Sequence, residues 1–571
     1  MVLSTSNDTA TRSPAWVRFL SSHRPRRFES LTRVAVASAR CRPVTTPAPT
    51  ARQELDAVTT ALQLRVAFPP EVIAEAEALL RAPGIDDPLL VDRTAIPFVT
   101  IDNAYSKDLD QAVHVAREGD GFMVAYAIAD ASFYVRPGSA LFAEAMARGA
   151  SYYFPGFSVP MLPRALSEGL VSLNPDGPRR ALLFWHSLDA NGELRGTKLE
   201  RARVHSRAKL SFSAVQQLID APATSALSGQ PYEESLKLLK VIGEKRIHLA
   251  AERGLVRYRR EEVSIELDGE GLSFAVMELV RDDVELWNEQ VSLMCNAEGG
   301  RLLRESNNPA VQPIYRVQGG PDPERLAGLA KLTERVCALN GVPEAPWRWN
   351  QSAPLADYLR ALPRAAAGTK EDRLARALMR QAVMVNLRSE YSMQPGPHVG
   401  VGAEPYARFS APMRELVGVF LHKEAVELLT GIHPTAEEDE KLRAQVVLVA
   451  NRSRQTQKKV QNLANEVVMN RVFEPELTKP KAERTIFTGT VMGLAGAKVH
   501  VRLDVPPMDV KVLLFDLAPF FGGAWLEVAD EGAMLRAKGK TEPLLLLGQA
   551  LKLTVAKRDV QHRRWVFEPV R

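Results

Sequence analysis

Three aspartates lie close together in an apolar, strand-forming part of the chain. Asp102, Asp108 and Asp110 all fall within residues 98–113, FVTIDNAYSKDLDQAV. In an extended segment residues two apart point to the same side, so Asp108 and Asp110 can converge and Asp102 can join them across a loop. Burying unpaired carboxylates is costly, so such a cluster is solvated, paired with cations or bound to a metal.

The ligand type favours one metal over another. Carboxylate oxygens are hard ligands that suit Mg²⁺, which keeps several waters and accepts phosphate oxygens as further ligands. A calcium-binding EF-hand loop from Asp102 does not fit, because it would need an oxygen ligand at Ala104 and a glycine at Lys107. On spacing alone, a surface loop whose acids pair with Lys107 and nearby arginines remains the alternative.

Strands are the elements that must hold these aspartates. Residues 96–101, 112–116 and 122–135 have strand patterns, and the turn at 118–121 predicts a hairpin. Helical patterns surround them at 54–64, 70–82, 141–148, 232–253, 284–304, 323–339, 370–391, 413–429 and 434–471. The mixture predicts an α+β fold with a large main domain.

After Pro480 the pattern returns to short alternating strands, which suit a small all-β OB-fold barrel. Its last strands carry Lys557, Arg558, Arg563 and Arg564 beside Trp565 and Phe567. Cations meet phosphates while rings stack on bases, so this pattern indicates a face for single-stranded RNA. A solvated basic face over core aromatics is the competing interpretation.

Composition limits the partners and the compartment that can be expected for this protein. The 571 residues carry 73 Lys plus Arg against 68 Asp plus Glu, a net charge of +5, which permits a polyanionic partner. Cys41, Cys295 and Cys337 lack metal or disulfide spacing, so we expect a reducing, cytoplasmic setting. No apolar run approaches the roughly 18 residues of a membrane span, and we expect a monomer with no membrane partner.

An ordered series of motifs runs through the middle of the chain. TIDNAYSKDLDQAV at 100–113 is followed by YAIADASFYVRPGSALFAEAMARGASYYFPGFSVPMLP at 126–163. SEGLVSLNPDGPRRALLF, SRAKLSF, YRVQ and PGPHVGVGAEPYARFSAPMREL then start at 167, 206, 315 and 395. The series resembles the catalytic domain of the ribonuclease II (RNB) exoribonucleases over roughly residues 64–429. The C-terminal barrel resembles the ribosomal-protein-type RNA-binding domain that closes this family.

The resemblance implies a function and roles for named residues. It implies processive 3′→5′ hydrolysis of single-stranded RNA to nucleoside 5′-monophosphates by water that a bound Mg²⁺, or Mn²⁺, activates. Asp102, Asp108 and Asp110 stand at the family's metal-binding positions, with Asp110 the one most tied to hydrolysis. Tyr153 matches a tyrosine that packs on the terminal nucleotide, and Arg414 an arginine that neutralises the phosphate in the transition state. The other expected RNA contacts are Glu289, Arg316, Lys557, Arg558, Arg563 and Arg564.

One departure from the family pattern bears on catalysis. The family usually has a fourth aspartate directly after Asp110, and this chain has Gln111, which offers a carbonyl oxygen as a possible fourth ligand but no charge. Gln318 also replaces a usual histidine, and Ala411 a usual serine. The alternative function is therefore a catalytically weakened RNA-binding protein that retains the fold.

The predicted organisation has five parts. Residues 1–51 form a basic extension rich in Ser, Thr and Arg, which is a disordered arm, a small helical RNA-contacting module or a transit peptide. A helical lead-in at 52–95, the catalytic domain at 96–430, a helical segment completing it at 431–482 and the barrel at 483–571 follow. The extension is too short for the cold-shock domains that commonly precede this catalytic domain, so a short form is expected.

Overall fold

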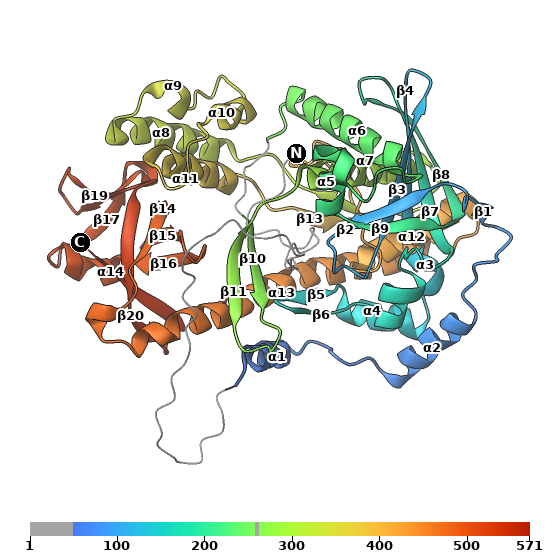
Figure 1. Ribbon diagram of the computed structural model, residues 1–571, viewed down its shortest axis with the longest axis horizontal. Helices are drawn as coiled ribbons and strands as arrows, with labels where there is room; N and C mark the ends of the chain where they lie inside the picture. The colour runs from blue at the N-terminus through green and yellow to red at the C-terminus, as the bar shows by residue number, and fades with distance from the viewer. Residues whose placement is uncertain (1–48, 257–261, 571) are drawn as a thin grey trace, which may run out of the picture.

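The computed structural model describes residues 49–256 and 262–570. The predicted extension at 1–51 lies outside the described residues except for its last three. Thr50 caps helix α1 (Ala51–Ala61), which therefore begins at the end of that extension. Figure 1 shows a large sheet domain joined by the long helix α13 (Ala436–Leu477) to a C-terminal group of strands.

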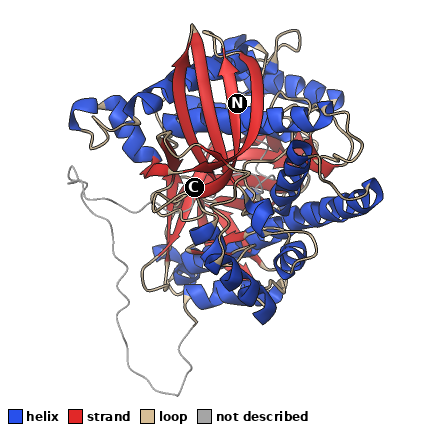
Figure 2. Ribbon diagram, turned by 90° about the vertical axis from the view of Figure 1, so that its right-hand side faces the viewer, coloured by secondary structure: helices blue, strands red, loops and turns tan. Residues whose placement is uncertain are grey.

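A seven-stranded mixed sheet forms the main domain, in the order β1-β8-β7-β4-β3-β2-β9. Figure 2 shows these strands side by side. The strands are β1 (Val91–Asp92), β2 (Phe98–Asp102), β3 (Gln111–Glu118), β4 (Gly121–Ala129), β7 (Arg179–Leu188), β8 (Leu194–Val204) and β9 (Ser206–Ser211).

The predicted hairpin is confirmed and lies at the centre of the sheet. β3 and β4 pair in antiparallel register from Gln111 opposite Ile128 to Glu118 opposite Gly121. Gly119 has a φ of 59° at the two-residue turn, a conformation that glycine adopts without steric cost. β4 lies between β3 and β7, and its side chains are buried along almost its whole length in the core that the sheet shares with the helices, which fits its continuous apolar run.

Helices pack around this sheet and bury one large core with it. The core includes side chains of α6, α7 and α12 as well as the sheet. The helices before α13 are α2 (Pro70–Arg81), α3 (Ala131–Tyr134), α4 (Ala140–Arg148), α5 (Phe212–Asp220), α6 (Glu233–Glu252), α7 (Asp283–Glu305), α8 (Pro323–Asn340), α9 (Glu344–Trp347), α10 (Leu355–Ala361), α11 (Lys370–Met384) and α12 (Leu416–Thr430).

Three two-stranded sheets complete the part of the chain before the C-terminal strands, and sequence patterns predicted none of them as pairs. They are β5 (Tyr152–Phe154) with β6 (Phe157–Val159), β10 (Glu262–Leu267) with β11 (Phe274–Leu279), and β12 (Tyr315–Val317) with β13 (Glu390–Ser392). The helix predicted over 370–391 is wrong at its end, because α11 stops at Met384 and residues 390–392 pair with β12 instead.

The C-terminal strands form an OB-like region, as predicted. A five-stranded sheet has the order β16-β15-β14-β20-β21, and a three-stranded sheet has the order β17-β18-β19. The elements are β14 (Phe487–Ala495), β15 (Lys498–Leu503), β16 (Asp509–Leu513), α14 (Leu514–Leu517), β17 (Leu526–Ala529), β18 (Met534–Ala537), β19 (Pro543–Leu546), β20 (Ala550–Asp559) and β21 (Arg564–Pro569).

Contacts with α11 and α13 hold this barrel on the rest of the chain. Arg373 of α11 pairs with Asp504 at 2.5 Å, and Phe473 of α13 packs edge to face on Phe567. None of the helices among the described residues is long and apolar enough to cross a bilayer.

Candidate active site

The carboxylate cluster lies where the chain leaves the sheet and returns to it. β2 ends at Asp102, the loop 103–110 carries Asp108 and Asp110, and Gln111 begins β3. Ser172 fixes this loop, since its Oγ accepts from the Leu109 N–H at 2.9 Å and donates to the Lys107 carbonyl at 2.7 Å. The two loop aspartates are therefore held on either side of a clamped residue.

Arg414 reaches this cluster from a distant part of the chain. Its Nε donates to Oδ2 of Asp110 at 2.6 Å, and the backbone N–H of Met413 donates to Oδ1 at 3.1 Å. Asp110 is 2 % exposed, so both oxygens of a buried carboxylate have donors. The structure thus brings together the two residues that the sequence marked as catalytic.

Tyr153 joins the cluster through its hydroxyl, which donates to Oδ2 of Asp108 at 3.5 Å. The tyrosine lies in β5, the short strand that packs against α13. Burial, with the nearby Asp108 carboxylate, raises the pKa of Tyr153 well above its usual value, so the hydroxyl stays protonated. Its ring is therefore held beside the aspartates in a fixed orientation.

Burial dominates the electrostatics of the site. It raises the pKa of Asp110 to about 6 although Arg414 opposes the shift, and the charge of Asp108 adds to it. Burial also raises the pKa of Asp102. Arg414 resists the same desolvation, because the three carboxylates and Tyr153 hold its pKa above the ordinary value. The aspartates carry more negative charge than one arginine neutralises.

This donor set fits a hard divalent cation. Asp102, Asp108 and Asp110 supply only oxygen ligands, and the excess negative charge is what a divalent ion would offset. A second group of three carboxylates is more tightly clustered than these aspartates. Within the described residues, it is the oxygens of Glu424, Glu427 and Asp439 that all lie within 4.8 Å of one another.

That second acidic group already has its cation. The ammonium of Lys423 lies 2.9 Å from Glu424, 2.9 Å from Glu427 and 2.6 Å from Asp439. The group joins α12 to the start of α13, and its four side chains are all buried. It is therefore a buried salt-bridge network in the helix junction.

Gln111, the possible fourth ligand, has its amide in other contacts. Its Nε2 donates to the carbonyl of Ser410, and its Oε1 accepts from the Tyr126 hydroxyl at 2.9 Å.

Two of the predicted RNA contacts, Glu289 and Arg316, interact with other side chains of the protein. Glu289 on α7 pairs with Arg281 at 3.3 Å. Arg316 is only 2 % exposed, and its Nη2 donates to the Ser389 hydroxyl at 2.9 Å. The structure therefore places Arg316 in the packing around β12 and β13 rather than on a surface. A role of either residue in RNA binding stays a prediction.

The basic residues of the barrel mostly have acidic partners. Arg558 pairs with Glu474 and Arg563 with Glu466, both on α13, and Arg564 pairs with Asp516. The prediction that Trp565 and Phe567 form a stacking face is wrong, since both are buried and pack against Phe473. Lys557 is exposed and forms no ion pair with the rest of the described chain.

The sequence did not reveal a second layer of charged residues beside Arg414. A small cavity there is lined by Tyr153, Tyr391, Arg408, Arg414 and Arg454, among others. Arg408 pairs with Glu415 at 3.2 Å, and the Tyr391 hydroxyl donates to the same glutamate. Arg408 and Glu415 flank Arg414 in the motif YARFSAPMREL, so that motif was the available signal.

Comparison with known proteins gives a family and relatives. The RNB domain family matches residues 91–431. Ribonuclease R of Vibrio parahaemolyticus is 30% identical over 339 residues, which are 58% of this chain and 38% of that protein. Exoribonuclease 2 of Yersinia enterocolitica is 28% identical over 489 residues, 84% of this chain and 70% of that protein. The matched part thus spans about two fifths of the Ribonuclease R length.

Solved structures share the fold. Mycoplasma genitalium RNase R in complex with ribose methylated single-stranded RNA has a TM-score of 0.78 at 22% identity, covering 91% of this chain and 78% of that one. Yeast Ssd1, a pseudonuclease, has a TM-score of 0.59 at 13% identity, covering 85% and 58%. At these identities the likeness concerns the fold alone. The family match covers more than half of the chain and includes all three aspartates and Arg414, so this protein belongs to the RNB domain family.

Proposed function

We propose that this protein is a metal-dependent exoribonuclease. It hydrolyses single-stranded RNA from the 3′ end, processively, and releases nucleoside 5′-monophosphates in the cytoplasm. Relatives named Ribonuclease R and Exoribonuclease 2 support the reaction class. The observation that carries the proposal is the pairing of Arg414 with Asp110 at 2.6 Å beside two further aspartates, because a fixed cation then lies next to carboxylates whose oxygens suit a divalent metal.

Asp102, Asp108 and Asp110 would hold the ion, Mg²⁺ or Mn²⁺. When bound, it would lower the pKa of a water molecule and offset charge on the scissile phosphate. The protein's own part is to hold these carboxylates in place: Ser172 clamps the loop that carries Asp108 and Asp110, and the Met413 N–H donates to Asp110.

Arg414 and Tyr153 act on the substrate side of the proposed site. Arg414 is permanently charged and can neutralise a phosphate oxygen when negative charge develops there. The Tyr153 ring can stack on the terminal base, a contact that tolerates any base because each has a π-face. Among the barrel residues, the exposed Lys557 is the proposed contact to RNA phosphates upstream.

One assay tests the reaction. The protein is incubated with Mg²⁺ and 5′-labelled oligo(A) RNA, and with the DNA of the same sequence as a control. We expect loss of RNA from its 3′ end with mononucleotides as product, DNA left intact, and no hydrolysis by Asp110→Asn. Wild-type protein that binds the RNA without shortening it would instead establish the alternative, an RNA-binding protein that retains the fold.

A further inference from the structure

Gln111 directly follows Asp110, yet its side chain makes its hydrogen bonds with different residues. Gln111 uses both ends of its amide: Nε2 donates to the Ser410 carbonyl and Oε1 accepts from the Tyr126 hydroxyl. That hydroxyl lies 3.0 Å from the Ser292 Oγ on α7. Gln111 therefore links β3, β4 and α7 to residue 410.

Residue 410 belongs to the segment 406–414, which has no helix or strand pairing of its own and ends at Arg414. Asn296, which is fully buried, holds its first half. Its Nδ2 donates to the Tyr406 and Ser410 hydroxyls, each at 3.0 Å, and its Oδ1 accepts from the Phe409 and Ser410 N–H groups at 2.8 and 3.0 Å. All four hydrogen bonds of one amide are thus used on this segment.

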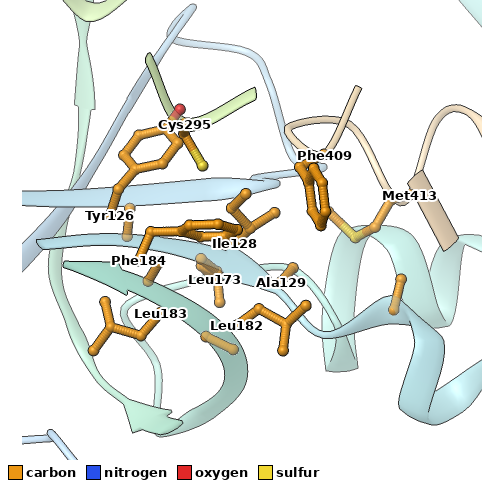
Figure 3. Packing of buried hydrophobic residues seen from close by; sticks show 14 of the residues in the cluster. Tyr126, Ile128, Ala129, Leu173, Leu182, Leu183, Phe184, Cys295, Phe409 and Met413 are labelled. Atoms are coloured by element: carbon orange, nitrogen blue, oxygen red, sulfur yellow. The ribbon is translucent and has the colours of Figure 1, made fainter. Parts of the chain in front are cut away.

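The same segment is also held by packing. Phe409 and Met413 are buried in the main core, and Figure 3 shows the two next to each other, with Phe409 toward Ile128 and Phe184 of the sheet. Ser410 lies between them, and its carbonyl oxygen needs a donor because a buried unpaired carbonyl is costly. Gln111 supplies that donor.

We propose that Gln111 is a positioning residue: by holding the Ser410 carbonyl it fixes the segment 406–414 and so the position of Arg414. We also propose that the RNA-free site binds a single divalent ion. The inference rests on the proposed function and concerns the same site. An acidic side chain at 111 could not do this, because a carboxylate would face the Ser410 carbonyl with no proton to donate.

The charges of the aspartates and Arg414 also favour one divalent ion. When all three aspartates are ionised, they carry three negative charges against the one positive charge of Arg414, and one divalent ion offsets the remaining two. For Gln111 to become a ligand, its oxygen would have to share or give up the Tyr126 hydroxyl, and it would still add no charge. The amide therefore contributes to the geometry of Arg414 rather than to the affinity for the metal.

The kinetic test is a double-mutant cycle in the full-length protein. Gln111→Met removes both hydrogen bonds at similar volume, and Gln111→Glu keeps the shape but replaces the donor with an acceptor. We expect both to lower kcat by about 100-fold with KM changed less than about threefold, as for a displaced catalytic group. In an Arg414→Ala background the same changes should cost less than about twofold, because Gln111 acts through Arg414. Full additivity would overturn the inference.

The binding test needs no turnover. Mn²⁺ titration followed by electron paramagnetic resonance, without RNA, should give one ion per wild-type protein and an affinity that Gln111→Met changes by less than about twofold. Two ions per wild-type protein would contradict the single-ion site, and a tenfold weaker affinity in Gln111→Met would make Gln111 a ligand; either result would overturn the inference. If Gln111→Met does not fold, Gln111→Asn, too short to reach Ser410, takes its place. A wild type without hydrolysis would reject the proposed function, while Mn²⁺ stoichiometry would still decide this inference.

Discussion

The Nε atom of Arg414 lies 2.6 Å from Oδ2 of Asp110, although 304 positions separate the two residues in the sequence. The contact joins the loop between β2 and β3 to the segment 406–414, and both partners are largely buried. Because the arginine already stands where negative charge is concentrated, it can stabilise more such charge without reorganising.

Replacing Arg414 should separate catalysis from metal binding. Arg414→Ala removes the cation, so we expect kcat to fall by about 100- to 1,000-fold, as for loss of one transition-state donor. The cluster then carries one more uncompensated charge, so Mn²⁺ should bind more tightly than in wild type. Arg414→Lys keeps the charge but not the planar fork, and should recover only part of kcat. Weaker Mn²⁺ binding in Arg414→Ala would contradict this role.

The metal should stabilise the protein in a pH-dependent way. Burial raises the pKa of Asp110 to about 6, so below that pH a proton occupies the carboxylate and competes with the ion. We expect a saturating Mn²⁺ concentration to raise Tm clearly at pH 8 and little at pH 5. At 100 times Kd the stabilisation is about 2.7 kcal/mol. Asp110→Asn should remove most of the shift at pH 8, and an equal wild-type shift at both pH values would argue against metal binding here.

Two substitutions at Tyr153 should distinguish its ring from its hydroxyl. Tyr153→Ala loses the stacking surface, and we expect about tenfold weaker binding of short oligo(A), within the range for one base stack. Tyr153→Phe keeps the ring and loses only the contact to Asp108, so its affinity should stay close to that of wild type. Fluorescence anisotropy with labelled RNA measures both. Equal losses in the two variants would show that the hydroxyl, not stacking, matters.

The barrel offers a matched pair of basic residues. Lys557 is exposed and has no ion pair within the described chain, whereas Arg564 pairs with both Asp516 and Asp559. Lys557→Ala should weaken RNA binding and reduce the slope of log affinity against log salt by about 1. Arg564→Ala should change that slope less and lower Tm more. The reverse pattern would place the RNA face elsewhere on the barrel.

The Lys423 network should make stability depend on pH. Burial raises the pKa of Glu427 to about 7, despite the hydrogen bond from Lys423, with Glu424 and Asp439 adding to the shift. A raised carboxyl pKa gives stability that is present below the unfolded value of about 4.5 and is lost as pH rises through 7. Glu427→Gln removes this loss, so urea unfolding should show a gain of about 1 to 2 kcal/mol over wild type at pH 8 relative to pH 5. An unchanged difference would mean that Glu427 does not titrate in this range.

The candidate site was predictable where chemistry and sequence position coincide. Asp102, Asp108 and Asp110 share one short segment, so their spacing alone indicated convergence. Arg414 and Tyr153 could be placed only through the family motifs, because nothing local to either residue indicates a partner 304 or 45 positions away. The contact of Gln111 with Ser410 was not predictable, since the two residues are 299 positions apart and no local pattern links them.

The secondary-structure prediction was wrong where pairing with a distant strand decided the backbone conformation. Residues 390–392 continue a helical pattern, yet they form β13 because β12 offers a partner and Asn451 of α13 accepts the Tyr391 N–H through its side chain. Trp565 and Phe567 follow Arg563 and Arg564 in the sequence, yet both aromatic side chains are buried because Phe473 of α13 packs against them. The packing of this helix on the barrel was not predictable from the local sequence.

Helix α13 has 42 residues, which at 1.5 Å per residue make it about 60 Å long. One part of it packs against β5, which carries Tyr153, and another against β20 of the barrel (Figure 1). A continuous helix of this kind fixes the separation between Tyr153 and the barrel. An RNA strand that contacts both at once would therefore need a minimum length. A strand shorter than that length would lose its contact with the barrel before its last nucleotides are removed.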